Sequence, residues 1–154
     1  MTSMTKEELN AMPVEFKLNG RDVVAHGHET IIQAAKRHGV EIPHLCYKEG
    51  MRPDGNCRAC VVEVKGERVL AASCCRKPAK GMEVITDNDR AQRSQKMVLE
   101  LLLSDMPKER HTLASELDQW AGKLKIGRPR FEARHQPKAD LSHHGIAVNL
   151  DSCI

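Results

Sequence analysis

Short alternating runs of apolar and polar residues in the first half of the chain indicate β-strands. They predict two hairpins and one short final strand, over residues 14–18 and 21–25, 61–64 and 68–71, and 82–85. Asn19-Gly20 joins the first pair of runs and Gly66-Glu67 joins the second. An Asn-Gly pair between two alternating runs is a strong signal for a tight hairpin turn, so the first hairpin is the clearer of the two.

Between the two hairpins the pattern changes to a helical one. Apolar residues recur at helical spacing within residues 30–38, and Gly39 supplies a stop signal. Residues 40–55 are rich in Gly and Pro with little periodicity, so a long loop is expected there. Hairpin, helix, long loop, hairpin and short strand is the order of a β-grasp (ubiquitin-like) domain. We therefore predict an α+β fold, with this domain at residues 12–86.

Residues 87–121 are expected to form a helical extension of that domain. Thr86 and Asp89 resemble a capping box, and Pro107 ends the first helix. One face of this helix is marked by Ala91, Ser94, Val98, Leu101 and Leu102. A shorter helix is predicted over residues 113–121.

The remaining residues, 122–154, are expected to form an extended tail with little packing. The tail opens with a basic, Pro-containing connector over residues 122–138. Residues 146–150 (IAVNL) alternate and could pair as a strand. No internal repeat is present.

Composition narrows the class of protein. The 154 residues carry a formal net charge of +3, which is too small to indicate nucleic-acid binding. The first ten residues contain no apolar signal segment, and the longest apolar run, at 98–103, is far too short to cross a bilayer. Six cysteines without a secretory signal favour a reducing compartment, where clustered cysteines are commonly metal ligands. A soluble cytoplasmic protein without membrane insertion is expected.

Four cysteines carry the chemical prediction. Cys46, Cys57, Cys60 and Cys74 have the spacing Cys-x10-Cys-x2-Cys-x13-Cys. The x2 pair allows two thiolates to converge on one metal centre from a single turn, and the fold must deliver the other two. A [2Fe–2S] cluster requires four thiolates, two on each iron, so the spacing predicts such a cluster with these four ligands.

The loop between these cysteines has features that suit an anionic cluster. The oxidised cluster with its four thiolates carries a charge of about −2, which is costly to bury without compensating dipoles. Gly50 and Gly55 permit positive φ angles, which let backbone N–H groups turn toward the sulfurs. Nearby cations are supplied by Lys48, Arg52, Arg58 and Arg76.

Zinc is the main alternative, with disulfides a minor third. A four-cysteine zinc site commonly uses two Cys-x2-Cys pairs, whereas this chain has one pair and two single cysteines.

Cys75 adjoins Cys74, and only one of the two can be the fourth ligand. Successive side chains on an extended strand point to opposite faces, so the two thiols cannot both reach one cluster. The residue that is not a ligand is expected to be a buried or half-buried thiol; we take this to be Cys75, on the resemblance described next.

At these residues the sequence resembles a known iron–sulfur domain. The similarity rests on His44-Leu-Cys-Tyr47, on Asn56-Cys-Arg-Ala-Cys60 with the strand after it, and on Ala72-Ser-Cys74 followed by Gly81-Met82. This domain opens the large iron–sulfur subunit of respiratory complex I, iron-only hydrogenases, and the α subunit of cytoplasmic NAD-dependent molybdenum or tungsten formate dehydrogenases. In that family the fourth ligand follows an Ala-Ser pair and precedes a Gly-Met pair by seven residues, which favours Cys74.

Two features choose among these relatives. Complex I subunits and many hydrogenases follow the long helix with a second cluster held by His-x3-Cys-x2-Cys-x5-Cys, but after His111 no cysteine occurs until Cys153. His111 is therefore expected to be an ordinary polar residue. The tail from His144 resembles the lead-in to the double [4Fe–4S] ferredoxin domain of formate dehydrogenase α subunits, in which Cys153 would be a first ligand. We interpret the chain as a piece of such a polypeptide, with Cys153 a free thiol; a complete small protein is the alternative.

The resemblance implies an electron-relay module without a substrate site or catalytic residue of its own. Its partners would be the [4Fe–4S] and molybdopterin domains of the parent chain and a flavin/NAD-binding subunit. The same module from another complex I-like or hydrogenase-type oxidoreductase is the first alternative, and a zinc-stabilised binding module the second. A cysteine-nucleophile enzyme would need a base from His26, His28, His38 or His44, and no spacing pairs one of these with a particular cysteine.

Overall fold

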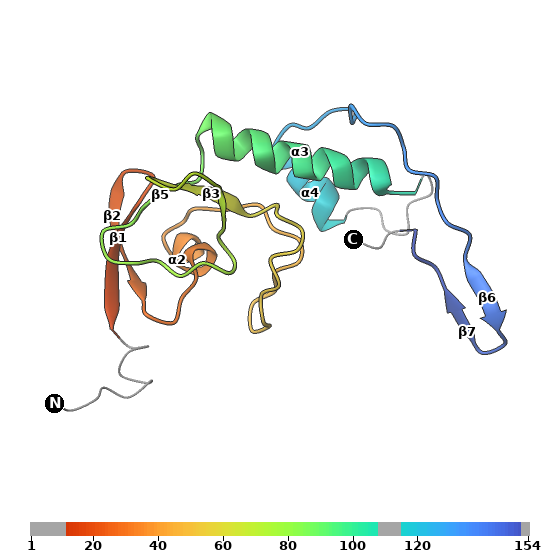
Figure 1. The fold of residues 1–154 in the computed structure, drawn as a ribbon, viewed down its shortest axis with the longest axis horizontal. Coiled ribbons are helices and arrows are strands. Elements are labelled where there is room, and N and C mark those ends of the chain that lie inside the picture. The colour runs from red at the N-terminus through yellow and green to blue at the C-terminus, as the bar shows by residue number, and fades with distance from the viewer. Residues whose placement is uncertain (1–11, 108–114, 152–154) are drawn as a thin grey trace. The chain divides into compact units, whose positions relative to one another are not determined.

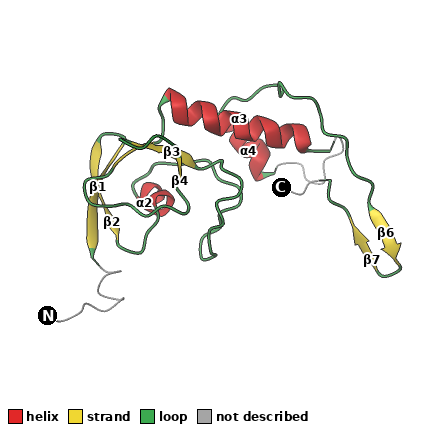
Figure 2. Cartoon of the chain, in the orientation of Figure 1, coloured by secondary structure: helices red, strands yellow, loops and turns green. Residues whose placement is uncertain are grey.

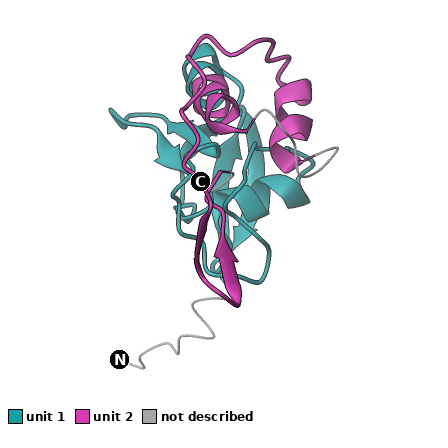
Figure 3. Ribbon diagram, turned by 90° about the vertical axis from the view of Figure 1, so that its right-hand side faces the viewer, with its two compact units in different colours: residues 1–95 teal, residues 96–154 magenta. Residues whose placement is uncertain are grey.

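The structure is a computed structural model that describes residues 12–107 and 115–151. It divides into two compact units, residues 1–95 and 96–154, which Figure 3 distinguishes by colour. The expectations for His111 and Cys153 lie outside the described residues. The division into segments 12–86, 87–121 and 122–154 stays a prediction.

The first unit is built on a five-stranded sheet that begins with the predicted hairpin. Strand β1 (Pro13–Leu18) pairs antiparallel with β2 (Arg21–His26) in a continuous register from Pro13↔His26 to Leu18↔Arg21. Asn19 and Gly20 connect them with φ angles of 50° and 79°. Two successive positive φ angles are what a two-residue hairpin turn of the favoured twist requires, so this prediction is confirmed.

The other strands complete a mixed sheet. Strand β5 (Glu83–Ile85) runs parallel to β1, and β3 (Val61–Val64) runs antiparallel to β5. With β4 (Ala71–Ala72) at the edge, the order is β2-β1-β5-β3-β4, so the first and last strands of the domain, β1 and β5, lie next to each other inside the sheet. Figure 2 draws the strands in yellow. This order confirms the α+β, β-grasp prediction. The second hairpin is shorter than predicted, because only Ala71 and Ala72 pair with β3 and residues 68–70 lie outside a strand.

Helix α2 (Ile31–Arg37) packs its apolar face into the core of this unit, beside the sheet (Figure 1). The Thr30 N–H donates to the Gln33 side-chain oxygen at 2.9 Å, which caps the start of the helix. Gly39 adopts a φ of 75° and ends it, as predicted. The core joins both ends of the domain and comprises, among others, Phe16, Leu18, Ile31, Ile32, Ala35, Ile42, Tyr47, Val62 and Val84.

Helix α3 (Asp89–Asp105) differs from its prediction at its cap and on its face. The side-chain oxygen of Asn88, not Thr86, accepts the N–H of Ala91 at 2.9 Å, because the Thr86 hydroxyl accepts a hydrogen bond from Asn19 instead. The most buried positions of the helix include Ala91, Gln95 and Leu99, whereas Leu101 is 45% exposed. The predicted face was therefore partly wrong, because a polar Gln95 occupies a position that the apolar pattern ignores.

The second unit contains α4 (Glu116–Lys123) and a two-stranded hairpin. Ser115 caps α4 by accepting the N–H of Asp118 at 3.1 Å. Residues 146–150 contain the predicted strand, β7 (Ile146–Val148), which pairs with β6 (Asp140–His143), a strand that the sequence pattern did not predict. The described part of the chain has no helix long and apolar enough to cross a membrane.

The basic connector of this unit is held to helix α3 by several polar contacts. The Arg130 guanidinium pairs with Glu100 of α3 at 2.6 Å. The Arg134 N–H donates to the Ser104 carbonyl at 3.0 Å, and the Gln136 amide donates to the Asp105 carbonyl at 2.7 Å. At least one of its basic side chains thus has an acidic partner within the chain itself.

Candidate metal centre

The first cysteine lies on a loop that is anchored in the core on both sides. Ile42 and Tyr47 are buried, and Cys46 between them is half-buried. The His44 Nδ1 donates to the Ile42 carbonyl at 2.8 Å, and its ring meets the Tyr47 ring edge to face at 5.7 Å. These contacts hold the backbone around Cys46 although the segment has no regular secondary structure.

The second and third cysteines follow a tightly turned segment. Gly55 has a φ of 67°, and Arg58, between Cys57 and Cys60, has a φ of 57°. A positive φ is unusual for a residue with a side chain and is found where the surroundings impose it. Cys57 is half-buried, and Cys60, immediately before β3, is fully buried. The positive φ predicted for Gly50 and Gly55 is confirmed, and that of Arg58 was not foreseen.

The fourth cysteine is placed by Ser73. The Ser73 backbone N–H and its hydroxyl both donate to the carbonyl of Cys60, at 3.1 and 2.7 Å. Helix α2 holds the same turn from the other side, because the N–H groups of Ile31 and Ile32 donate to the carbonyls of Arg76 and Ser73. The start of α2 has free amides that need such acceptors, so sequence positions far apart fix Cys74 beside Cys60.

Cys60 and Cys74 form a buried pair of thiols. Burial raises the pKa of Cys74, and the adjacent Cys60 and Cys75 thiols raise it further. Without a metal the Cys74 group is therefore a neutral thiol at neutral pH. Thiolate ligation requires loss of that proton, which a bound cation promotes. The pair thus has the donor chemistry of a metal site.

Cys75 does not behave as the sequence pattern predicted. Residues 73–75 form a turn, not an extended strand, and the Sγ atoms of Cys74 and Cys75 lie 3.6 Å apart. The premise that they point to opposite faces was wrong for this reason. Cys75 is also exposed, not buried or half-buried. The Cys75 Sγ lies against the loop that carries the other cysteines, 3.9 Å from the Pro53 carbonyl oxygen.

The expected cations differ in their surroundings. Arg76 pairs with Glu67 at 2.8 Å, so its charge is already partly balanced. Lys48, Arg52 and Arg58 are exposed on the loop between Cys46 and Cys60.

Within residues 12–107 and 115–151, no three His, Cys, Asp or Glu side chains lie close enough to hold one metal ion together. A two-iron cluster does not require three side chains to meet at one point, because each iron takes two thiolates. The buried Cys60–Cys74 pair, the half-buried Cys46 and Cys57, and the left-handed residues of the loop fit that donor set. That Cys46, Cys57, Cys60 and Cys74 are the ligands stays a prediction.

A comparison with protein families matches residues 11–89 to the 2Fe-2S iron-sulfur cluster binding domain. The chain belongs to this family. The matched range contains all four predicted ligands and the whole five-stranded sheet.

Similar proteins include subunits of NADH oxidoreductases. The mitochondrial NADH-ubiquinone oxidoreductase 78 kDa subunit of Candida albicans is 40% identical over 94 residues, which are 61% of this chain and 13% of that protein. An NADH-quinone oxidoreductase subunit of Rickettsia felis is 33% identical over 94 residues, 61% of this chain and 14% of that protein. The chain thus spans about one seventh of the length of these relatives.

Among solved structures, a chain of an NAD⁺-reducing [NiFe]-hydrogenase in the H2-reduced state is similar in fold. The TM-score is 0.73 with 27% sequence identity, over 84% of this chain and 57% of that chain. The ferredoxin-like fold is therefore shared with a chain of this hydrogenase, and the sequence is related to the NADH oxidoreductase subunits. None of these comparisons singles out formate dehydrogenase.

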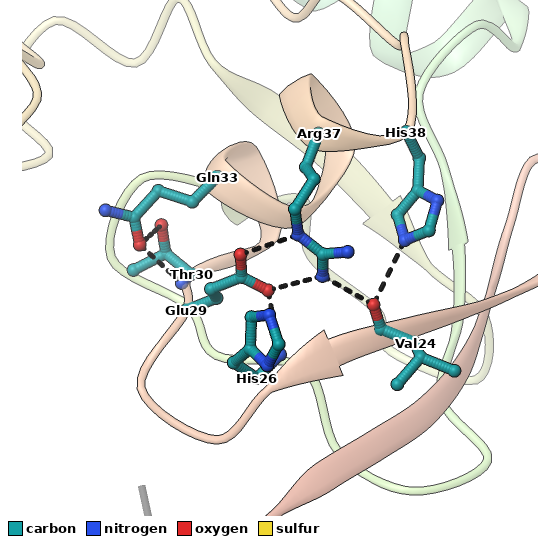
Figure 4. A network of polar contacts seen from close by, with 7 residues as sticks. All are labelled: Val24, His26, Glu29, Thr30, Gln33, Arg37 and His38. Atoms are coloured by element: carbon teal, nitrogen blue, oxygen red, sulfur yellow. Dashed lines mark hydrogen bonds and ion pairs between the residues drawn. The ribbon is translucent and has the colours of Figure 1, made fainter. Parts of the chain in front are cut away.

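Two of the histidines considered as possible bases, His26 and His38, take part in a polar network around helix α2. Glu29 is buried and receives two hydrogen bonds from Arg37, at 2.8 and 2.9 Å, and one from the His26 backbone (Figure 4). These contacts lower the pKa of Glu29 to about 2, chiefly through Arg37. His38 Nε2 donates to the Val24 carbonyl at 3.0 Å, as Figure 4 shows. The network ties α2 to β2.

Proposed function

We propose that this chain carries one electron at a time on a [2Fe–2S] cluster held by Cys46, Cys57, Cys60 and Cys74. The single observation that supports this most is the buried Cys60–Cys74 pair within a domain of the 2Fe-2S cluster binding family. Since these two thiols are adjacent, we assign them to one iron and Cys46 and Cys57 to the other.

The protein residues hold and insulate the cluster. When bound, the cluster supplies one-electron redox chemistry, and its potential depends on hydrogen bonds to sulfur and on solvent exposure. Ser73 fixes the buried pair through the Cys60 carbonyl. The left-handed residues Gly55 and Arg58 turn the loop sharply, and such turns can direct several N–H groups to one anion.

The wider context of the module is a second part of this proposal. We assign the chain to an NAD-linked formate dehydrogenase, as the relay between a molybdopterin site and a flavin/NAD subunit, with further [4Fe–4S] clusters in the same polypeptide. The support is the resemblance of the tail from His144 and the absence of cysteines between Cys75 and Cys153. Cysteine thiolates that bind a cluster favour a reducing compartment, and we therefore assign the chain to the cytoplasm. A complex I-like or hydrogenase-type parent is the alternative.

Anaerobic purification tests the cluster. We expect about two irons and two acid-labile sulfides per chain, and a rhombic paramagnetic resonance signal after reduction with dithionite. Replacement of Cys46, Cys57 or Cys60 by Ser should remove the cluster or make it labile. Stoichiometric zinc with no sulfide would contradict the proposal and favour the zinc alternative.

The context needs a separate experiment. Sequencing the gene beyond codon 154 should show Cys153 followed by two further cysteines at x2 spacing, then a molybdopterin domain. An immediate stop codon, or a hydrogenase domain in that place, would contradict the formate dehydrogenase assignment and leave the cluster untouched.

A further inference from the structure

The turn after β4 places two adjacent cysteine sulfurs on the same side of the chain. The N–H groups of Cys75 and Arg76 both donate to the Ala72 carbonyl, at 3.1 and 3.0 Å, which closes the backbone into a turn. As a result the Sγ atoms of Cys74 and Cys75 lie 3.6 Å apart. Two thiolates bound about 2.3 Å from one tetrahedral metal lie about 3.8 Å from each other. The two sulfurs therefore have nearly the separation of two ligands of one metal ion.

The Cys75 sulfur also faces the loop that carries the other proposed ligands. It lies 3.9 Å from the Pro53 carbonyl oxygen. Gly55 leaves room for it, because a Cβ at that position would be 2.8 Å from the Cys75 Sγ. Cys75 is nevertheless exposed, whereas Cys74 is fully buried. The two thiols thus approach the same region, one from the interior and one from the solvent side.

We propose that Cys75 is a second thiolate donor for the iron assigned to Cys74, and that it takes over ligation when Cys74 is removed or displaced. This inference rests on the proposed function. In the exchange the Cys75 S–H gives its proton to solvent and forms an iron–sulfur bond, while the bond from iron to Cys74 breaks and Cys74 takes up a proton. Neither the iron nor the sulfur changes oxidation state, so no other reactant is needed.

The two ligation states should differ in their spectra. A bond to Cys75 would replace a fully buried ligand by one on the exposed side of the turn. Cluster properties depend on solvent exposure and on hydrogen bonding at the ligand sulfurs. The g-values of the reduced cluster are therefore expected to shift on exchange, even where the iron content does not change.

The experiment compares the wild-type chain with C74A, C75A and C74A/C75A, because alanine cannot act as a ligand. All are reconstituted anaerobically, and iron, sulfide and paramagnetic resonance are measured. We expect wild type and C75A to hold the full cluster with the same g-values. C74A should keep at least half of the iron with shifted g-values, and C74A/C75A should fall at least fivefold below C74A. C57A is the matched control, since no cysteine adjoins Cys57, and it should lose the cluster.

Several outcomes would overturn the inference. Equal cluster loss in C74A and C74A/C75A would show that Cys75 does not ligate. C74S serves as a second variant in case C74A fails to fold. Loss of the cluster in both C74A and C74S also contradicts the inference. Loss in C75A with retention in C74A would make Cys75 the primary ligand. A wild-type chain without a cluster would instead contradict the proposed function, so failure of the inference about Cys75 and failure of the proposed function are distinguishable.

Discussion

The contact between Gly55 and Cys75 gives a prediction whose size follows from the structure. Gly55 has a φ of 67° and Gly50 a φ of 83°, and both lie on the same loop. A Cβ at Gly50 would meet nothing within 4 Å, whereas one at Gly55 would be 2.8 Å from the Cys75 Sγ. Replacement of each glycine by Ala therefore imposes the same backbone strain, but only Gly55→Ala adds a steric clash.

The two effects can be given magnitudes. A left-handed backbone costs an L-residue about 1–2 kcal/mol, and the stiffer unfolded chain of the alanine variant returns about 0.4–1 kcal/mol. Gly50→Ala should therefore destabilise the chain by about 1 kcal/mol. The crowded Sγ ends an exposed side chain that can rotate aside, so overpacking adds about 1 kcal/mol, and Gly55→Ala should cost about 2 kcal/mol in total.

Urea denaturation of the four chains Gly50→Ala, Gly55→Ala, Cys75→Ala and Gly55→Ala/Cys75→Ala, followed by far-ultraviolet circular dichroism, measures these free energies. Removal of the Cys75 sulfur should relieve the clash, so the double variant should recover about 1 kcal/mol relative to the sum of the single changes. The reasoning is refuted if Gly55→Ala costs no more than Gly50→Ala, or if the two changes at 55 and 75 simply add.

Three further predictions concern the supports of the site. Ser73→Ala should cost about 1 kcal/mol, since the Cys60 carbonyl keeps its backbone donor, and should shift the g-values of the reduced cluster; unchanged spectra would contradict the role of the hydroxyl. Gln95→Ala should cost about 2–4 kcal/mol in urea denaturation, because Gln95 is 2% exposed and donates to a strand carbonyl at 2.8 Å. Arg37 lowers the pKa of Glu29 to about 2, so this pair stabilises the fold above the unfolded pKa of about 4.3 and loses its effect as the pH falls toward 2. Arg37→Gln should therefore cost about 2 kcal/mol at pH 7, and its difference from wild type should shrink below pH 4.5; a constant difference down to pH 3 would argue against the pair.

The parts of the fold that sequence could predict are those set by neighbouring residues. The first hairpin depends on Asn19-Gly20 adopting positive φ angles between alternating strands, and helix α2 depends on a local pattern that ends at Gly39. The β-grasp order follows from the sequence of such elements. Gln95 shows the limit, because its burial depends on a carbonyl of β3 that is 34 residues away. A hydrophobic pattern contains no information about such a partner.

The turn at Cys74 and Cys75 shows why the finer geometry of the site could not be predicted. The pattern predicted a strand over residues 68–71, and an extended chain continuing through Cys74 and Cys75 would separate the two sulfurs. The strand ends at Ala72 because its carbonyl accepts two amides of the turn and because the first amides of α2 take the carbonyls of Ser73 and Arg76. The same contacts that bury Cys74 beside Cys60 thus bring the Cys75 Sγ to 3.6 Å from the Cys74 Sγ. A second donor beside a buried ligand is therefore a consequence of how the helix holds this turn, and a substitution that loosened the hold of α2 on the carbonyls of Ser73 and Arg76 should alter both sulfurs together.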